Sequence, residues 1–332
     1  MTSLAELTTI RVGGTPTLLT IAATEAEIIE AVSAADDAGQ ELLILGGGSN
    51  LVVADDFKGQ VLKIASTGYE NDSTVCAGAW VTVQAGHNWD DFVNDCVRNG
   101  WLGVEALSGI PGTVGATPIQ NVGAYGQQVS ETIAQVRAWN RETKTVETIF
   151  SSNCEFGYRS SVFKANPGTW VILSVTFQLP LGTMSAPIAY NELAAKLGVE
   201  LGDRVSASDL QAAVLELRAG KGMVLDSADH DTWSVGSYFM NPRVETAPDN
   251  APNWPEADGT VKVSAAWLIE QAGFNKGFTL NGRAALSSKH TLAITNRGDA
   301  TSADISELAD HIVAGVKAKF GIELKPEATF IN

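Results

Sequence analysis

The sequence has little that would suit a disulfide framework, a metal site or a nucleic-acid surface. Its three cysteines, Cys76, Cys96 and Cys154, are odd in number and form no Cys-x-x-Cys pair. Its four histidines are scattered, and none stands at a metal-ligand spacing from another. Lysine and arginine total 22 against 38 acidic residues, and the net charge of −16 argues against nucleic-acid partners and anionic membranes. We therefore expect a reduced, metal-free protein.

Long hydrophobic runs are also missing. The first residues, MTSLAELTTIRVGG, contain no apolar stretch of signal-peptide length, and no run of 18 apolar residues occurs elsewhere. These absences predict a cytoplasmic protein without membrane insertion. A chain of 332 residues with 45% hydrophobic and 18% charged residues is typical of a soluble protein with two or three subdomains.

Periodicity and capping signals predict an α+β fold. Thr24 and Glu27 form a capping box ahead of an amphipathic helix with Ile28 and Val32 on one face. Helices are expected at 24–39, 88–99, 206–220, 264–273 and 301–321. Strands are expected at 42–45, 61–64, 74–85, 133–140, 146–150, 170–179 and 329–332. The composition changes near Pro187, which indicates one α+β region at about 1–182 and a second at about 200–332.

Two glycine-rich stretches are candidates for cofactor binding. Gly46-Gly47-Gly48-Ser49-Asn50 follows a predicted strand, where glycine lets backbone N–H groups approach an anion such as a diphosphate. It lacks the G-x-G-x-x-G spacing of a dinucleotide fingerprint, and by itself a triple glycine also suits a tight turn. The run 107–126 is long, rich in glycine and poor in charge. Such a stretch suits either a loop wrapped round a polar cofactor or a plain surface loop.

Five strings in order carry a resemblance to a known family. They are LGGGSNLVV, SGIPGTVGATPIQNVGAYG, FGYRSSVFK, VGSYFMNP and LKPEATFIN, and they run from residue 45 to the C-terminus. Together they closely resemble the UDP-N-acetylenolpyruvoylglucosamine reductases (UDP-N-acetylmuramate dehydrogenases). Each string alone is modest support, whereas five in sequence order are specific.

The resemblance implies an FAD-binding fold of the vanillyl-alcohol-oxidase (PCMH) type with a separate α+β substrate domain. The implied ranges are 1–66 and 67–185 for two FAD-binding subdomains and 200–332 for the substrate domain. The implied ligands are non-covalent FAD, NADPH as reductant and a UDP-sugar. The implied reaction reduces UDP-N-acetylglucosamine enolpyruvate to UDP-N-acetylmuramate for peptidoglycan synthesis, with hydride from flavin N5.

The same resemblance assigns site residues. Those that would hold FAD are Gly46, Gly47, Gly48, Ser49, Asn50, Leu51, Ser108, Gly109, Ile110, Gly112, Thr113, Gly115, Ile119 and Gly123. Those that would hold the substrate are Tyr158, Tyr190, Lys221, Asn241 and Gln271. The catalytic set would be Arg159, Ser237 and Glu327.

Chemistry gives each catalytic assignment a rationale and an ordinary alternative. Arg159 offers a fork that matches a carboxylate, but a Tyr-Arg pair between strands is also a common surface pair. Ser237 follows glycine, as structural serines do, while the family role is proton donor to the substrate. A hydroxyl is a poor acid at neutral pH, so that role needs a neighbouring charge or a proton relay. Glu327 reads as an exposed carboxylate or, by resemblance, as a group that polarises the substrate, which partial burial would favour.

Two other functions stay open, and a few positions depart from the family pattern. A flavin oxidase on the same fold would often hold FAD covalently through a histidine, but only His87 lies within 45–126, outside the glycine-rich loops. A nucleotide-sugar binding protein without turnover would be expected to have lost the catalytic set. Thr329 stands where the family often has arginine, and Tyr238 and Met240 stand where phenylalanine and lysine are common.

Overall fold

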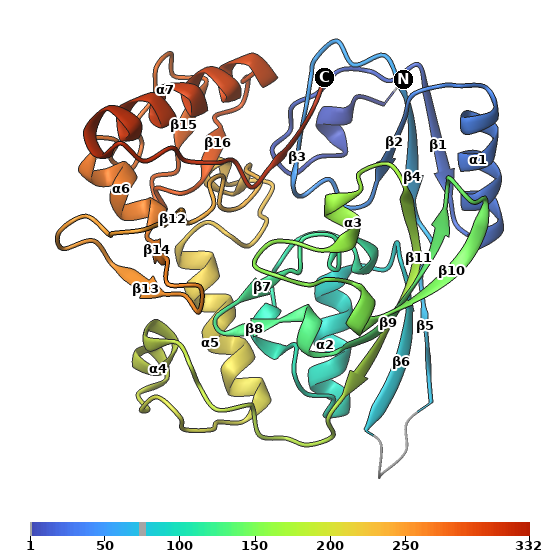
Figure 1. Ribbon diagram of the computed structural model, residues 1–332, viewed down its shortest axis with the longest axis horizontal. Helices are drawn as coiled ribbons and strands as arrows, with labels where there is room; N and C mark the ends of the chain where they lie inside the picture. Colours follow the sequence, from blue (N-terminus) through green and yellow to red (C-terminus); the bar gives the residue numbers. More distant parts are fainter. Residues whose placement is uncertain (1, 73–77) are drawn as a thin grey trace. The chain divides into compact units, whose positions relative to one another are not determined.

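The computed structural model describes residues 2–72 and 78–332 (Figure 1), and it divides into two compact units. The sheet unit comprises Pro16–Gly47 and Gly59–Ala219. The C-terminal unit comprises Met1–Thr15, Gly48–Lys58 and Gly220–Asn332. Within the described residues, no helix is both long enough and apolar enough to span a bilayer.

The sheet unit begins with a small parallel sheet. Its strands are β1 (Leu18–Ala22), β4 (Gln60–Ile64) and β2 (Leu42–Leu45), in that order. β1 and β2 each pair in parallel with the central strand β4, and α1 (Glu25–Asp37) is the crossover that connects β1 to β2. The capping box of Thr24 and Glu27 is formed, so the predicted start of this helix is confirmed.

A five-stranded antiparallel sheet follows in the same unit. Its order is β10 (Thr145–Phe150), β9 (Ile133–Asn140), β11 (Trp170–Leu179), β6 (Ala79–Gln84) and β5 (Tyr69–Asn71). Helix α2 (Trp89–Asn99) contributes Trp89 and Phe92 to the core, where the ring of Phe92 lies 5.0 Å from that of Phe177 on β11. The helix ends at Gly100, whose φ of 68° is the left-handed conformation that glycine adopts readily.

Shorter elements complete the sheet unit. They are β7 (Gly123–Ala124), β8 (Gln127–Gln128), α3 (Val162–Ala165), α4 (Asn191–Leu197) and α5 (Ala207–Gly220), whose last residue belongs to the other unit. A separate apolar cluster joins α4 to α5 through Leu193, Leu210 and Val214.

The C-terminal unit has three small sheets and two main helices. The sheets are β12 (Arg243–Val244) with β14 (Val261–Val263) and β13 (Asn253–Pro255), β15 (Ala284–Leu286) with β16 (Ile294–Asn296), and β17 (Thr329–Ile331) with β3 (Leu51–Val53). Helices α6 (Ala265–Gln271) and α7 (Ser302–Phe320) bury Leu268, Ile305 and Ile312 in this unit's core. β17 pairs with β3 in parallel, so the last segment of the chain joins the segment Gly48–Lys58 in one sheet.

The predicted helices and most predicted strands are present, and the fold class is confirmed as α+β. The first part of the strand predicted at 74–85, residues 74–77 with Cys76 among them, lies outside the described residues. Several short elements were not predicted, among them β3, β5, β13 to β16, α3 and α4. Residues 1–15 and 48–58 group with the C-terminal unit rather than with the nearby first strands. The proposed pair of FAD-binding subdomains stays a prediction.

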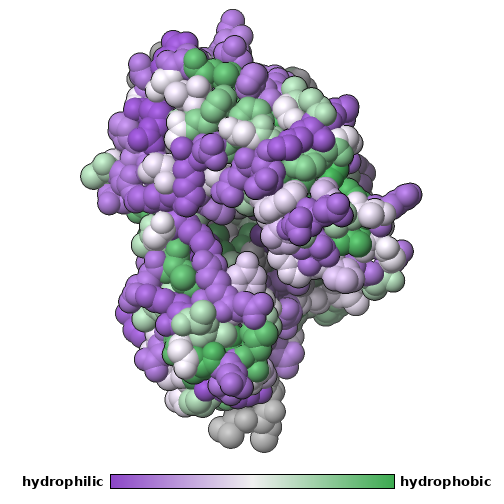
Figure 2. Space-filling view, turned by 90° about the vertical axis from the view of Figure 1, so that its left-hand side faces the viewer, coloured by the Kyte–Doolittle hydropathy of each residue, from purple (hydrophilic) through white to green (hydrophobic). Residues whose placement is uncertain are grey.

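The surface drawn in Figure 2 is largely hydrophilic. On the face drawn in Figure 2, hydrophilic residues predominate and hydrophobic ones form small groups between them. Elsewhere Ile21 is 61% exposed and Phe150 is 58% exposed, each on an edge strand of its sheet. Single exposed hydrophobic residues of this kind are normal in folded proteins.

Candidate active site

In the sheet unit, the two glycine-rich stretches pack directly on each other. A Cβ atom built on Gly47 would lie 2.5 Å from the Cα atom of Gly112, and one on Gly46 would lie 2.6 Å from Oγ1 of Thr113. Such distances are far inside van der Waals contact. At Gly47 the opposing atoms are backbone, so only glycine fits there without a backbone shift, whereas at Gly46 the opposing atom is a side-chain oxygen that would have to move. The structure thus brings together two segments that the sequence assigned to one cofactor.

The triple-glycine loop continues into the C-terminal unit at Gly48. There the loop turns with a φ of +62°, and a Cβ atom would lie 2.1 Å from the carbonyl oxygen of Leu7. The amides of Gly47, Gly48 and Ser49 donate no hydrogen bond to any residue that the structure describes. Consecutive free N–H groups on glycine-rich backbone suit the oxygens of a diphosphate, so this loop fits the anionic part of FAD.

Asn50 and Leu51 connect this loop to the last segment of the chain. The side-chain amide of Asn50 donates to the carbonyl oxygen of Glu327 at 3.3 Å, and its own carbonyl accepts from Thr329 at 3.0 Å. Leu51 is paired with Thr329 in the sheet of β3 and β17. Two residues assigned to FAD therefore hold the segment that carries a predicted catalytic glutamate.

Residues 112–115 form hydrogen bonds with the segment 85–89, which joins β6 to α2. The Gly115 amide donates to the carbonyl of Ala85 at 2.8 Å, and a Cβ atom on Gly115 would lie 2.6 Å from that of Ala85. Thr113 forms an isolated antiparallel bridge with Asn88. For Gly115 the structure shows close packing with its amide already bonded, so any contribution to FAD binding would have to come from the space that its missing side chain leaves.

Ser108 and Gly109 are anchored by helices on either side. The Gly109 amide donates to the carboxylate of Asp90, at the start of α2. The Ser108 hydroxyl accepts from Gln211 of α5 at 3.1 Å, and the carbonyl of Gly109 accepts from Arg218 at 3.3 Å. Burial lowers the pKa of Arg218 to about 10. This part of the loop is held in place, and the neighbouring Ile110 packs against the core of the unit.

Arg159 lies against the far end of the same glycine-rich stretch. Its guanidinium donates to the carbonyl of Gly123 at 2.9 Å, and its centre lies 5.6 Å from the ring of Tyr158. The hydroxyl of Ser161 donates to the carbonyl of Ile119. Two residues assigned to FAD, Ile119 and Gly123, are therefore bonded to the segment that contains the predicted catalytic arginine.

Three non-glycine residues, in the glycine-rich stretch 107–126 and in the segment that contacts its far end, have a left-handed backbone conformation. The φ values are +52° for Arg159, +46° for Asn121 and +48° for Tyr125. Such conformations cost free energy for residues with a side chain, and they concentrate at functional sites. Asn121 holds the bend by donating to the carbonyl of Gly157 at 3.1 Å and accepting from the amide of Ser130 at 3.1 Å.

Tyr190, predicted to contact the substrate, is 42% exposed at the start of α4. Its ring meets that of Tyr125 edge to face at a centroid distance of 5.5 Å. Burial raises the pKa of both phenols, that of Tyr125 to about 12. Tyr125 was not among the predicted site residues, although its place between two glycines of the cofactor stretch, Gly123 and Gly126, was a usable signal.

Ser237 and Glu327 belong to adjacent segments of the C-terminal unit. The amide of Glu327 donates to the carbonyl of Tyr238 at 2.7 Å, and the amide of Met240 donates to the carbonyl of Lys325 at 3.0 Å. Both Ser237 and Glu327 are partly buried. The structure therefore aligns the backbones of two predicted catalytic residues that are far apart in the sequence.

The remaining substrate candidates are spread over the C-terminal unit. Lys221 is partly buried just after α5. The side-chain oxygen of Asn241 accepts from the amide of Ala265 at 2.9 Å, at the start of α6. Gln271 is exposed at the last residue of that helix. The contacts of Lys221, Asn241 and Gln271 with substrate stay predictions.

Side chains that could ligate a metal, and two cysteine thiols, occur in the described part of the chain. Residues 2–72 and 78–332 contain no group of three or more His, Cys, Asp or Glu side chains placed to hold a metal ion. Cys96 and Cys154 are buried free thiols, and burial raises the pKa of Cys154 to about 11. A buried thiol with a raised pKa is a poor nucleophile.

Two family models match the chain. One, described as an FAD binding domain, matches residues 16–149, and the other, described as the C-terminal domain of UDP-N-acetylenolpyruvoylglucosamine reductase, matches residues 227–331. The structure also resembles crystallised UDP-N-acetylenolpyruvylglucosamine reductase from Thermus caldophilus. The TM-score is 0.69 at 23% identity, over 100% of this chain and 98% of that one, which supports the shared fold.

Curated relatives extend the similarity to nearly the full length. UDP-N-acetylenolpyruvoylglucosamine reductase from Cutibacterium acnes is 51% identical over 99% of this chain and 89% of the relative. The enzyme of the same name from Streptomyces avermitilis is 50% identical over 99% of this chain and 93% of the relative. The chain is therefore an FAD-binding oxidoreductase that belongs to the UDP-N-acetylenolpyruvoylglucosamine reductase family.

Proposed function

We propose that the protein reduces UDP-N-acetylglucosamine enolpyruvate to UDP-N-acetylmuramate with NADPH, in the cytoplasm, as a step of peptidoglycan precursor synthesis. The observation that carries the proposal is the alignment of the Ser237 and Glu327 segments, joined at 2.7 Å through the backbone of Tyr238. That alignment places a hydroxyl and a carboxylate on neighbouring segments. The names of the curated relatives supply the substrate.

FAD would be held by the triple-glycine loop and the stretch that packs on it. The free amides of Gly47, Gly48 and Ser49 would bind its diphosphate, because oriented backbone dipoles attract an anion without a lysine or arginine. When bound, FAD would supply the redox chemistry, taking a hydride from NADPH and giving it to the methylene carbon of the substrate.

The catalytic side chains would control charge and one proton. The Arg159 fork would bind the enolpyruvyl carboxylate, which gains negative charge as hydride arrives at the neighbouring double bond. Ser237 would protonate the adjacent carbon, so that the C=C bond becomes CH–CH₃. Glu327 would assist at the carboxylate. Tyr158, Tyr190, Lys221, Asn241 and Gln271 would hold the nucleotide-sugar.

Anaerobic stopped-flow absorbance at the flavin band tests the proposal. NADPH should bleach the flavin, and the colour should return only after UDP-N-acetylglucosamine enolpyruvate is added. Bleaching without recovery would reject this substrate. If NADPH causes no bleaching, an oxidase acting on an alcohol or hydroxy acid becomes the better explanation, and acid precipitation would then show whether the flavin is covalently attached.

A further inference from the structure

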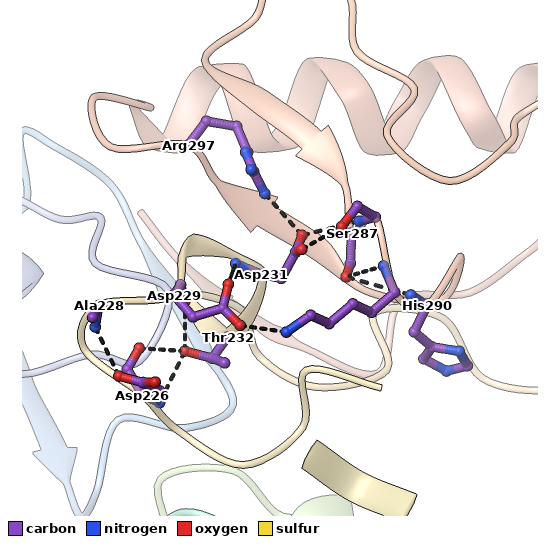
Figure 3. A network of polar contacts seen from close by, with 10 residues as sticks. Asp226, Ala228, Asp229, Asp231, Thr232, Ser287, His290 and Arg297 are labelled. Atoms are coloured by element: carbon purple, nitrogen blue, oxygen red, sulfur yellow. Dashed lines mark hydrogen bonds and ion pairs between the residues drawn. The ribbon is translucent and has the colours of Figure 1, made fainter. Parts of the chain in front are cut away.

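A buried carboxylate in the C-terminal unit lies at the centre of a polar network that no predicted site residue belongs to (Figure 3). Asp231 is 5% exposed. One of its oxygens accepts from the amide of Ser288 at 2.9 Å and from the guanidinium of Arg297 at 2.8 Å. The other accepts from the hydroxyl of Ser288. A buried charge with three donors is costly to disturb, because removing it leaves those donors unpaired.

A second contact ties the same two segments together. Asp229, two residues earlier, accepts from the ammonium group of Lys289 and from the amide of Asp231. Both side chains of this ion pair are about one-third exposed, so water screens the pair and it stabilises the fold less than the buried hydrogen bonds of Asp231 do. Together the two aspartates fasten the short helix at His230–Thr232 to the loop 287–293.

The loop 287–293 joins β15 to β16, and it also holds the Ser237 segment. Its Leu292 carbonyl accepts from the amide of Tyr238 at 2.7 Å. On the other side, the carbonyl of Tyr238 accepts from the amide of Glu327 at 2.7 Å. The residue after Ser237 is therefore bonded on one edge to the clamped loop and on the other to the glutamate segment.

The backbone around Ser237 is held between buried core residues, Val235 on one side and Tyr238 on the other. Gly236 has a φ of +75°, and its amide donates to the hydroxyl of Ser234 at 3.2 Å. The nearest other cross-strand contact in this direction is the bridge between Ser234 and Thr295. The hydrogen bond from the Tyr238 amide to the Leu292 carbonyl is thus one of the contacts that set the backbone position of the residue after Ser237, and it is the one that comes from the loop 287–293.

We propose that Asp231 is a positioning residue for Ser237: by clamping the loop 287–293 at Ser288, it fixes the Leu292 carbonyl that holds the Tyr238 amide. This inference rests on the proposed function, since it concerns the proton donor of that reaction. Asp231 itself takes no part in proton or hydride transfer. Misplacement of a reacting group by about 1 Å can cost about 100-fold in rate.

The test compares Asp231→Asn with a matched control, Asp304→Asn. Asp304 is also 5% exposed and paired with an arginine in this unit, at 2.7 Å from Arg283, but it caps α7 and has no hydrogen bond to the loop 287–293. Both variants should lose similar stability. In anaerobic stopped flow, both should show wild-type flavin reduction by NADPH, and only Asp231→Asn should slow flavin reoxidation at saturating substrate, by roughly 10- to 100-fold.

A measurement independent of turnover uses hydrogen exchange on the purified holoenzyme. Exchange at the Tyr238 amide should become faster in Asp231→Asn and stay near wild type in Asp304→Asn. Ser288→Ala removes only the hydroxyl donor and should produce a smaller change in the same direction, so it decides the question if Asp231→Asn does not fold.

Equal reoxidation rates and equal Tyr238 exchange in the two aspartate variants would overturn the inference, as would a Ser288→Ala variant identical to wild type. These results differ from a failure of the proposed function, in which the wild-type protein itself would not reoxidise with the enolpyruvyl sugar.

Discussion

Gly47→Ala tests whether the close packing of the two glycine-rich stretches builds the FAD site. The added Cβ atom would lie 2.5 Å from Cα and 3.0 Å from the carbonyl carbon of Gly112. Optimal carbon–carbon separation is about 3.5–4.0 Å, so the two backbones must part by about 1 Å or more. No flexible side chain can absorb this shift, because the opposing atoms belong to the backbone.

The expected magnitude follows from the cost of overpacking a core, which is about 1–3 kcal/mol. If the loops part when FAD binds, the same free energy weakens FAD binding by roughly 5- to 150-fold, at about 1.4 kcal/mol per tenfold. If the strain is instead borne by the folded apoprotein, Tm should fall by several degrees, at about 2–4 °C per kcal/mol.

The assay is a titration of apoprotein with FAD, followed by quenching of flavin fluorescence, together with thermal unfolding. Gly220→Ala is the control, since a Cβ atom at that helical position meets nothing within 4 Å and should leave FAD affinity unchanged. A Gly47→Ala protein with wild-type FAD affinity and wild-type Tm would refute the argument that this contact shapes the site.

Four further changes probe other parts of the molecule. Ser237→Ala should leave flavin reduction by NADPH nearly intact and cripple reoxidation by the enolpyruvyl sugar in stopped flow; equal loss in both would contradict its role as proton donor. Arg159→Lys should raise the KM for that sugar and lower kcat, because a single ammonium cannot form two parallel hydrogen bonds with a carboxylate. Trp89→Ala, at a fully buried ring whose indole N–H donates to a carbonyl at 3.1 Å, should cost about 3–5 kcal/mol in urea unfolding. Burial would raise the pKa of Asp304, but hydrogen bonds from the Thr301 cap outweigh it and lower the pKa. The contribution of ionised Asp304 to the free energy of unfolding is therefore present above about pH 3.9, the pKa of an aspartate in the unfolded chain, and is lost as the pH falls below it. Asp304→Asn should therefore make the free energy of unfolding depend less steeply on pH in that acid range.

Local features of the sequence were enough to predict most helices and the long strands. The strands at 133–140 and 170–179 have the predicted bounds, and α1 starts at its predicted cap, Thr24. These signals are local because a cap is satisfied by residues three positions away, and a strand or helix shows its period within its own length. The short β5 has too few residues to show a period, which explains why it was missed.

The candidate site was predicted through the family resemblance rather than through residue chemistry. Isolated from their context, Ser237 and Glu327 have no distinguishing local pattern, since a serine after glycine and a glutamate after proline are common. The left-handed backbone at Arg159 and Tyr125 also leaves no trace in the sequence, because a non-glycine residue adopts it only where surrounding contacts impose it.

The sequence by itself determined which segments form helices and strands, and where glycine permits close backbone approach. Only the tertiary structure decided that β17 lies parallel to β3, that Glu327 borders Tyr238 and that Asp231 is buried against Ser288. Pairing between distant segments depends on which apolar faces are buried together and on which buried polar groups find partners. Neither condition is met within a short stretch of chain, so these contacts exist only once the whole C-terminal unit has folded.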